Sequence, residues 1–264
     1  MLLTLVATIS RHDRVVLRQK KKGNSMTTKE KTTLPIELPT LDEMLKAGVH
    51  FGHQSSRRHP KMQQFIYTKR NNIHVIDLAW TRTKLEEALN FTSQIAANGG
   101  VILFVGSKKQ ACESVQKAAE RCGMPYIVGR WIGGIFTNFD QVGKLIQKLK
   151  KLETDEKEGA WQKYKKSEQT KFKKVQMKLK EFVGGVHEMT KLPKAIYIVD
   201  IKKEKTAVAE ANKKNIPIIA MTDTNVNPEK VQYPIPANDD AVSSIALISG
   251  LVADAIIASR KPAE

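Results

Sequence analysis

The chain has 264 residues, 41% of them hydrophobic and 27% charged, a composition that excludes disordered, collagen-like and disulfide-stapled proteins. At roughly 150 residues per domain, this length suits one large domain with an insertion or two small domains. Lysine and arginine total 44 against 27 acidic residues, and the resulting net charge of +17, carried by residues 1–199, indicates a polyanionic partner.

Residues 1–33 are predicted to form a basic extension that precedes the folded part of the chain. Residues 2–9 are apolar, but the basic residues follow them, which is the reverse of a secretory signal. Met26 is an alternative start, and three explanations stay open for residues 1–25. They are an upstream start codon, a disordered basic arm and an organellar transit peptide.

Three segments, residues 40–43, 83–86 and 107–110, fit the capping-box pattern and predict helix starts. In this pattern a hydroxyl accepts a backbone N–H, and the side chain three positions later reaches back. Apolar residues at helical spacing follow the second and third segments, and they stop at residues 99–100 and at Gly123. Both helices are therefore expected to be amphipathic.

A β-hairpin is predicted between the first two of these helices. Two short apolar segments, residues 65–67 and 73–76, flank the sequence Lys-Arg-Asn-Asn at residues 69–72. The asparagine pair tolerates the left-handed conformation that a tight turn needs. The turn is expected to expose two positive charges.

Four unbroken apolar runs predict the main sheet. Runs of this kind, rich in Ile and Val and separated by helices, are typical of strands buried on both faces of a parallel sheet. The fold class is therefore α/β, with a Rossmann-like doubly wound parallel sheet. The four runs are residues 101–105, 126–128, 195–199 and 216–221.

Residues 138–183 interrupt this alternation and predict an inserted coiled-coil helical hairpin. Apolar residues recur there at spacings of three, four and three in two separate stretches. They are Val142, Leu145, Leu149 and Leu152, then Phe172, Val175, Leu179 and Phe182. The segment 140–182 carries a net charge of +6, so we expect a basic arm that protrudes from an α/β domain of residues 34–137 and 184–259.

Catalytic and cofactor motifs are incomplete throughout the chain. The patterns GxGxxG, GxxxxGK[ST], GxSxG, HExxH and CxxC do not occur. The prediction is therefore a protein that is not an enzyme and has no cofactor. Cys112 and Cys122 are expected to be reduced thiols, and the apolar residues 242–258, interrupted by Ser and Asp, are expected to form a buried helix rather than a membrane span.

No metal site is predicted either. His50 and His53 stand three positions apart, but no cysteine or carboxylate lies at ligand spacing from them. Asp223, Asp239 and Asp240 follow presumed strands, where α/β proteins place active sites. The favoured interpretation is that Asn238, Asp239 and Asp240 open the C-terminal helix and cap it.

Basic side chains on predicted turns and helix starts carry the strongest functional signal. Arginine and lysine on turns reach phosphates, and a neighbouring aromatic ring stacks on a base or ribose. Together with the net charge, these residues favour nucleic acid as the partner. The predicted contacts are Arg57, Arg58, Lys61, Lys69, Arg70, Lys108, Lys109, Arg130 and Trp131.

Five ordered motifs resemble the family of bacterial-type small-subunit ribosomal protein two, over about residues 34–258. The motifs are LKAGVHFGH with RRHPKM at residues 45–62, YTKRNNIHVIDL at 67–78, ILFVGSK at 102–108, RWIGGIFTN at 130–138, and the stretch 192–241 that closes on YPIPANDDA. The family usually has glycine where this chain has Ala237, so that loop is expected to differ locally. The long acidic C-terminal tail of many members is also missing, and residues 1–25 are additional.

The resemblance implies a Rossmann-like sheet with a protruding coiled-coil hairpin, no catalysis, and assembly onto small-subunit rRNA. It implies a position between the head and body of the subunit, a role late in assembly, and help in docking the mRNA-binding ribosomal protein one. Other neighbouring small-subunit proteins are expected partners, whereas a membrane and a small-molecule substrate are not. The nine residues above become candidate rRNA contacts, on phosphates and shape rather than on base edges. The cytoplasmic ribosome is the expected location, and an organellar ribosome stays open.

Two other interpretations of the residues remain. A Rossmann-type enzyme would use the turn at residues 106–108 to hold a phosphorylated ligand on backbone amides at a helix N-terminus. A basic adaptor would bind a protein partner through residues 142–182. The first predicts stabilisation by nucleotides, and the second predicts that removing the arm abolishes association.

Overall fold

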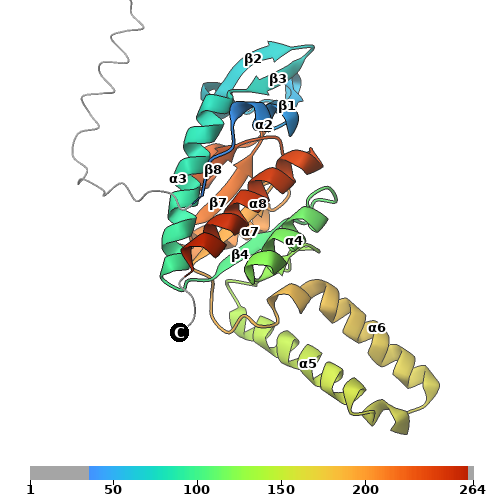
Figure 1. Cartoon of the computed structure of the whole chain (residues 1–264). Helices are drawn as coiled ribbons and strands as arrows, with labels where there is room; N and C mark the ends of the chain where they lie inside the picture. The colour runs from blue at the N-terminus through green and yellow to red at the C-terminus, as the bar shows by residue number, and fades with distance from the viewer. Residues whose placement is uncertain (1–35, 261–264) are drawn as a thin grey trace, which may run out of the picture. The chain divides into compact units, whose positions relative to one another are not determined.

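A computed structural model describes residues 36–260 of the chain (Figure 1). It contains a five-stranded sheet with the order β5-β4-β6-β7-β8 and a three-stranded sheet with the order β1-β3-β2. The predicted basic extension at residues 1–33, with Met26, lies outside the described residues.

All neighbouring strands of the five-stranded sheet are parallel, which confirms the predicted fold class. The strands are β4 (Ile102–Val105), β5 (Tyr126–Ile127), β6 (Ala195–Val199), β7 (Ile218–Thr222) and β8 (Tyr233–Pro236). Every residue of β4, β6 and β7 is buried, as expected for strands covered on both faces. From β4 the chain moves first to β5 and then returns to β6 on the other side, so the winding direction reverses between β4 and β6.

The fifth strand, β8, was missed by the sequence analysis. It holds Pro234 and Pro236, and proline lacks the N–H that a central strand needs for its second ladder. β8 pairs only with β7 and stands at the edge of the sheet. An edge strand tolerates these prolines, so a pattern that argues against a central strand is compatible with this position.

Helices cover both faces of the sheet and enclose two cores. The first core lies under α3 (Leu78–Ala97), α4 (Cys112–Cys122) and α8 (Val242–Ser259), and the second lies under α7 (Lys205–Lys213). Ile102 and Phe104 point into the first core, whereas Leu103 and Val105 point into the second. Each such fully buried side chain contributes about 1.5–3 kcal/mol to folding.

Helix α8 is long and apolar enough to span a membrane by composition alone. In the structure it packs against α3 and α4, and Ile245, Ile248 and Val252 lie in the first core. This packing accounts for its apolar sequence.

One of the three predicted capping boxes is present. Thr40 caps the short helix α2 (Leu41–Lys46): its backbone N–H donates to Glu43 Oε2 at 2.8 Å, and Glu43 N–H donates to Thr40 Oγ1 at 3.3 Å. The predicted helix end at Gly123 is also confirmed, with φ of 61°.

The helix starts predicted at residues 83 and 107 are wrong. Helix α3 already begins at Leu78 and is capped by Asp77, so Thr83 lies inside the helix and donates its hydroxyl to the Ala79 carbonyl at 3.0 Å. Helix α4 begins at Cys112, and the Ser107 hydroxyl instead donates to a distant carboxylate, that of Glu204. A hydroxyl near a helix has several acceptors within reach, and the capping pattern does not choose among them.

The predicted hairpin is confirmed. β2 (Ile66–Arg70) pairs antiparallel with β3 (Ile73–Ile76), and Asn71 and Asn72 adopt φ of 48° and 61° in the turn. A third strand, β1 (Phe51–Gln54), pairs with the other edge of β3 and was not predicted.

Residues 139–183 form two helices, α5 (Phe139–Lys157) and α6 (Lys166–Val183), that lie side by side (Figure 1). Val142, Leu149 and Val183 join the second core and anchor the two helices to the sheet. Near the connection between the helices, Trp161 packs against Phe172, with ring centroids 5.8 Å apart. The description of this pair as a separate coiled-coil insertion stays a prediction.

Candidate nucleic-acid interface

The carboxyl ends of the parallel strands meet at one edge of the five-stranded sheet, called here the carboxyl edge. The loops there are residues 106–111 after β4, 128–138 after β5, 200–204 after β6, 223–227 after β7 and 237–241 after β8. In open parallel sheets, ligands bind at this edge, close to the point where the winding direction reverses. Several of the predicted contact residues follow these strand ends.

Lys108 points into an acidic cluster at the carboxyl edge. Its Nζ lies 2.6 Å from Asp239 Oδ1, 2.6 Å from Asp240 Oδ1 and 3.5 Å from Asp200 Oδ2. Burial alone lowers the pKa of Lys108, but the attraction of Asp239 and Asp240 outweighs burial and raises it above its ordinary value. Lys108 is therefore an internal ion-pair residue, and its ammonium is not free for a phosphate.

Of the predicted capping residues, Asn238 accepts backbone N–H groups directly before α8, whereas Asp239 and Asp240 pair with Lys108. Helix α8 begins after Ala241 without a side-chain cap, and it is Asn238 that accepts the Asp240 N–H at 2.9 Å. Burial, together with the charges of Asp223 and Asp200, raises the pKa of Asp239 to about 7, although Lys108 opposes this shift.

His53 joins the same cluster from β1 and links the two sheets. Its Nδ1 lies 2.9 Å from Asp223 Oδ2 and its Nε2 lies 3.5 Å from Asp240 Oδ2. The close contact with the Asp223 carboxylate raises the pKa of His53, against the effect of burial. His50 does not take part: its Nδ1 is buried without a hydrogen-bond partner in the described part of the chain.

Four of these residues bring potential metal ligands together, although the Lys108 ammonium already pairs with two of them, Asp239 and Asp240. His53, Asp223, Asp239 and Asp240 each offer one ligand atom, and these atoms lie within 4.8 Å of one another. No metal site was predicted, because no cysteine or carboxylate stands at ligand spacing from His50 and His53 in the sequence. The fold brings those carboxylates from 170 or more positions away, which spacing patterns cannot detect.

Arg57, Arg58 and Lys61 lie at the carboxyl edge although they follow β1. The His59 N–H donates to the Thr224 carbonyl at 2.8 Å and thereby fixes this segment beside the end of β7. All three basic residues are exposed. Lys61 forms an ion pair with Glu229, whereas Arg57 and Arg58 have no acidic partner within residues 36–260.

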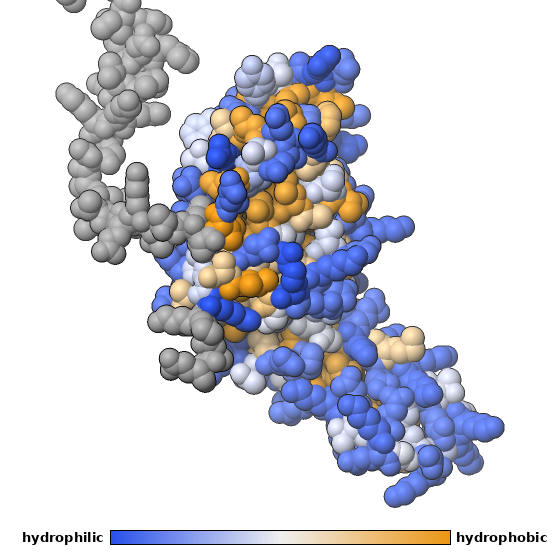
Figure 2. Space-filling model, viewed as in Figure 1, coloured by the Kyte–Doolittle hydropathy of each residue, from blue (hydrophilic) through white to orange (hydrophobic). Residues whose placement is uncertain are grey.

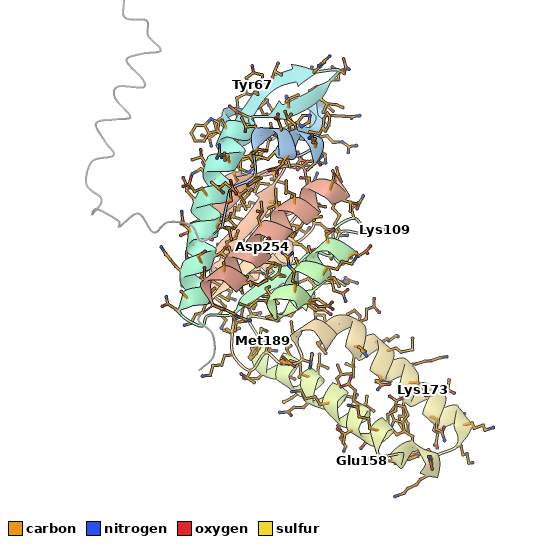
Figure 3. All side chains as sticks on the ribbon, viewed as in Figure 1. Tyr67, Lys109, Glu158, Lys173, Met189 and Asp254 are labelled. Atoms are coloured by element: carbon orange, nitrogen blue, oxygen red, sulfur yellow. The ribbon has the colours of Figure 1, made fainter. Side chains whose placement is uncertain are left out.

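Lys109 and Arg130 are exposed on the loops after β4 and β5. Figure 3 labels Lys109 on the loop before α4, with its side chain directed away from the packed helices. The fold therefore gathers Arg57, Arg58, Lys61, Lys109 and Arg130 at one edge, although they come from three separate parts of the sequence.

Trp131 is turned inward. Its ring is only 8% exposed and packs edge-on against Phe136, with centroids 5.1 Å apart. Its Nε1 donates to Glu210 Oε1 at 3.3 Å. A base cannot stack on a ring that is covered in this way, so the structure does not support Trp131 as a stacking residue.

Lys69 and Arg70 lie apart from the carboxyl edge, at the last two positions of β2, and both are exposed. Tyr67, two residues before Lys69 on the same strand, is 75% exposed and was not predicted (Figure 3). Tyr67, Phe51 and Ile73 line a cavity of about 420 Å³. Tyr67 and Lys69 share a face of β2, because residues two apart on a strand point to the same side.

The loop that contains Ala237 was expected to differ locally, because alanine replaces a glycine there. The structure shows no backbone strain at this position. Ala237 is fully buried, its N–H donates to the Thr222 carbonyl at 3.2 Å, and its φ is not positive. Alanine therefore fits this backbone conformation.

Comparison with known proteins places the chain beside one family. Residues 44–259 match the family described as ribosomal protein S2. The small ribosomal subunit protein uS2 of Bdellovibrio bacteriovorus is 46% identical over 222 residues, which is 84% of this chain and 71% of that protein.

Proposed function

The chain belongs to the ribosomal protein S2 family, and from this premise we propose that it binds small-subunit rRNA between the head and body of the subunit, supports late assembly, and helps to dock the mRNA-binding ribosomal protein one. Members of this family are structural proteins of the small ribosomal subunit that act in translation without catalysis, and in bacteria the ribosome is cytoplasmic.

The turn after β4 does not suit the alternative of an enzyme with a phosphorylated ligand. The Ser107 N–H donates to Glu204 Oε1 at 3.2 Å, so a carboxylate already occupies the place that a phosphate would take. The neighbouring Lys108 is held by three aspartates. Both groups that would bind the ligand are thus engaged within the protein.

The observation that supports rRNA binding most directly is the gathering of exposed basic residues at the carboxyl edge. We assign phosphate contacts there to Arg57, Arg58, Lys109 and Arg130, with a smaller contribution from Lys61 because Glu229 competes for its charge. These side chains lie on loops and short 3-10 helices, where they reach phosphates of an A-form helix without entering its grooves.

Two further basic surfaces extend this interface. Lys69 and Arg70 form one at the end of β2. The other is on α6, where Lys171, Lys174 and Lys178 are exposed and share one face at spacings of three and four. Because one face of a helix presents its charges as a row, α6 is suited to follow a phosphate backbone.

For the protein partner, the three-stranded sheet offers an apolar surface. Phe51 is 50% exposed, Tyr67 75% and Ile73 37%, and orange side chains gather over this sheet at the top of Figure 2. Exposed apolar patches on soluble proteins mark interaction sites. We therefore place the docking of ribosomal protein one on this patch rather than on the basic loops.

Charge reversal at the carboxyl edge tests the rRNA contacts. We expect the double variant Arg57→Glu with Arg58→Glu to bind a small-subunit rRNA transcript about tenfold or more weakly, with a salt slope reduced by about one for each lost phosphate contact. Filter binding between 50 and 300 mM KCl measures both quantities.

The matched control reverses Lys213 and Lys214, which are exposed at the end of α7, at the opposite edge of the sheet. This variant has the same net charge as the first. Equal weakening by both variants would show that only total charge matters, and that outcome would contradict a defined interface at the carboxyl edge.

A further inference from the structure

Glu210 is a buried glutamate that has no basic partner among residues 36–260. It lies on the inner face of α7 and is 8% exposed. A buried carboxylate without a cation is costly unless several donors satisfy its oxygens. The hydrogen-bond donors around the Glu210 carboxylate therefore identify the segment that this residue stabilises.

All of the donors to Glu210 come from the loop of residues 131–137, which connects β5 to α5. Their donor–acceptor distances are 3.3 Å for Trp131 Nε1, 2.7 Å for Gly134 N, 3.0 Å for Phe136 N, and 3.3 Å each for Thr137 N and Thr137 Oγ1. The loop folds round one carboxylate as phosphate-binding loops fold round a phosphate, with several backbone amides converging on one anion. Gly134 makes this possible because its φ of 102° is a conformation that other residues rarely adopt.

The donors also keep Glu210 charged. Burial alone would raise its pKa, but the backbone N–H groups of Gly134 and Phe136 outweigh burial and hold the pKa of Glu210 below its ordinary value. The carboxylate is therefore ionised at neutral pH, the state in which it accepts all of these hydrogen bonds.

The loop that Glu210 holds stands between two parts of the proposed rRNA surface. Arg130 immediately precedes it, and α5, the helix that packs against the basic helix α6, begins two residues after it, at Phe139. Ile135 and Phe136 anchor the middle of the loop in the second core. The direction of Arg130 and the root of the helix pair α5–α6 thus depend on one loop conformation.

We propose that Glu210 is a positioning residue for rRNA binding: by collecting the backbone donors of residues 134–137 it fixes the loop that presents Arg130 and the root of α5. This inference rests on the proposed function for its consequence in rRNA binding. Its structural part, the closure of the loop by one carboxylate, is tested without RNA.

The first experiment follows the loop in the free full-length protein. In Glu210→Ala and Glu210→Gln we expect faster hydrogen exchange at the amides of Gly134, Phe136 and Thr137, and a shifted indole N–H resonance of Trp131 in ¹H–¹⁵N spectra. Glu113→Ala is the control, because Glu113 is exposed on α4 and, within residues 36–260, pairs only with Lys117. Unchanged exchange and an unchanged Trp131 resonance in both variants would overturn the proposal.

The second experiment restores the missing anion. Glu210→Ala is expected to bind the rRNA transcript about tenfold more weakly, because the loop loses the charged group that accepts its hydrogen bonds. Acetate fits the space left by the side-chain carboxyl group, so replacing chloride by acetate at equal ionic strength is expected to recover part of the affinity. Glu210→Gln, whose amide fills the space, is expected to show no such recovery.

The possible outcomes separate the two proposals. Wild-type affinity in Glu210→Ala, or an affinity that acetate leaves unchanged, overturns the positioning role. If the wild-type protein itself shows no preference for the rRNA transcript, the proposed function fails, while the exchange rates of residues 134–137 still report whether Glu210 closes the loop. Where Glu210→Ala fails to fold, Glu210→Gln provides the same exchange comparison.

Discussion

Two kinds of basic loop occur in this protein. Two loops hold one side chain inward and keep the neighbouring basic residue, Lys109 or Arg130, exposed, whereas a third exposes both of its basic residues. The loop after β4 and the loop after β5 turn Lys108 and Trp131 inward, against carboxylates. The turn between β2 and β3 leaves Lys69 and Arg70 in solvent. In the sequence the two kinds look alike, because each places basic residues beside Gly or Asn.

The difference comes from acidic residues elsewhere in the chain: Asp239 and Asp240 hold Lys108. Glu204, directly before α7, binds the Ser107 backbone and hydroxyl, and Glu210 within α7 binds the loop after β5. The β2–β3 turn has no acidic partner in the described part of the chain. Which side chain of such a loop turns inward is thus decided by acidic residues about 75 to 130 positions away, not by the loop's own sequence.

The largest expected effect concerns the inward lysine. Lys108→Met leaves the surrounding aspartates without their cation, and we expect the free energy of unfolding to fall by about 3–5 kcal/mol. Lys109→Met, at the exposed neighbouring position, is expected to change it by less than about 0.5 kcal/mol. Urea unfolding followed by circular dichroism measures both variants.

Equal stabilities for the two variants would remove the distinction between inward and outward loops, because Lys108 would then behave as a surface residue. A loss of rRNA affinity in a Lys108→Met protein that remains fully folded would return Lys108 to the list of direct contacts.

Much of the fold was predictable because its signals are local. The buried runs of β4 and β6, the asparagine turn and the αL glycine at position 123 depend on residues close to one another in the sequence. The edge strand β8 was missed because its prolines argue against a strand unless the strand order is known. The start of α3 was displaced because Thr83 has a second acceptor for its hydroxyl.

The candidate site was predictable only in part, because its local signals can be found in the sequence whereas its contacts between distant segments cannot. The sequence identified which loops carry positive charge, but not that His53, Asp223 and Asp239 meet, since they come from three distant segments. It also pointed to Trp131 as the stacking aromatic because it neighbours Arg130. The direction of a side chain depends on tertiary partners, and here the partner is Glu210.

The second prediction tests the outward turn. Lys69→Glu with Arg70→Glu is expected to weaken rRNA binding about tenfold and to flatten its salt dependence, because two phosphate contacts are lost. The free energy of unfolding should stay within about 0.5 kcal/mol of wild type, since neither side chain has a folded-state ion pair within residues 36–260. Filter binding and urea unfolding on the same preparations separate the two effects. If stability falls together with affinity, the turn is part of the folded framework and the contrast with Lys108 is lost.

The smallest effect is expected at the turn itself. Asn72 has φ of 61°, a conformation that a β-branched residue adopts at a cost of about 1 kcal/mol. Asn72→Val should therefore lower the free energy of unfolding by that amount, and it should weaken rRNA binding slightly because the displaced turn moves Lys69 and Arg70. Asn72→Gly is the matched control, since glycine accepts this φ and adds no side chain. If valine and glycine variants were equally stable, the left-handed turn would not be needed to display these charges, and the exposed position of Lys69 and Arg70 would have to follow from the strand pairing of β2 with β3 alone.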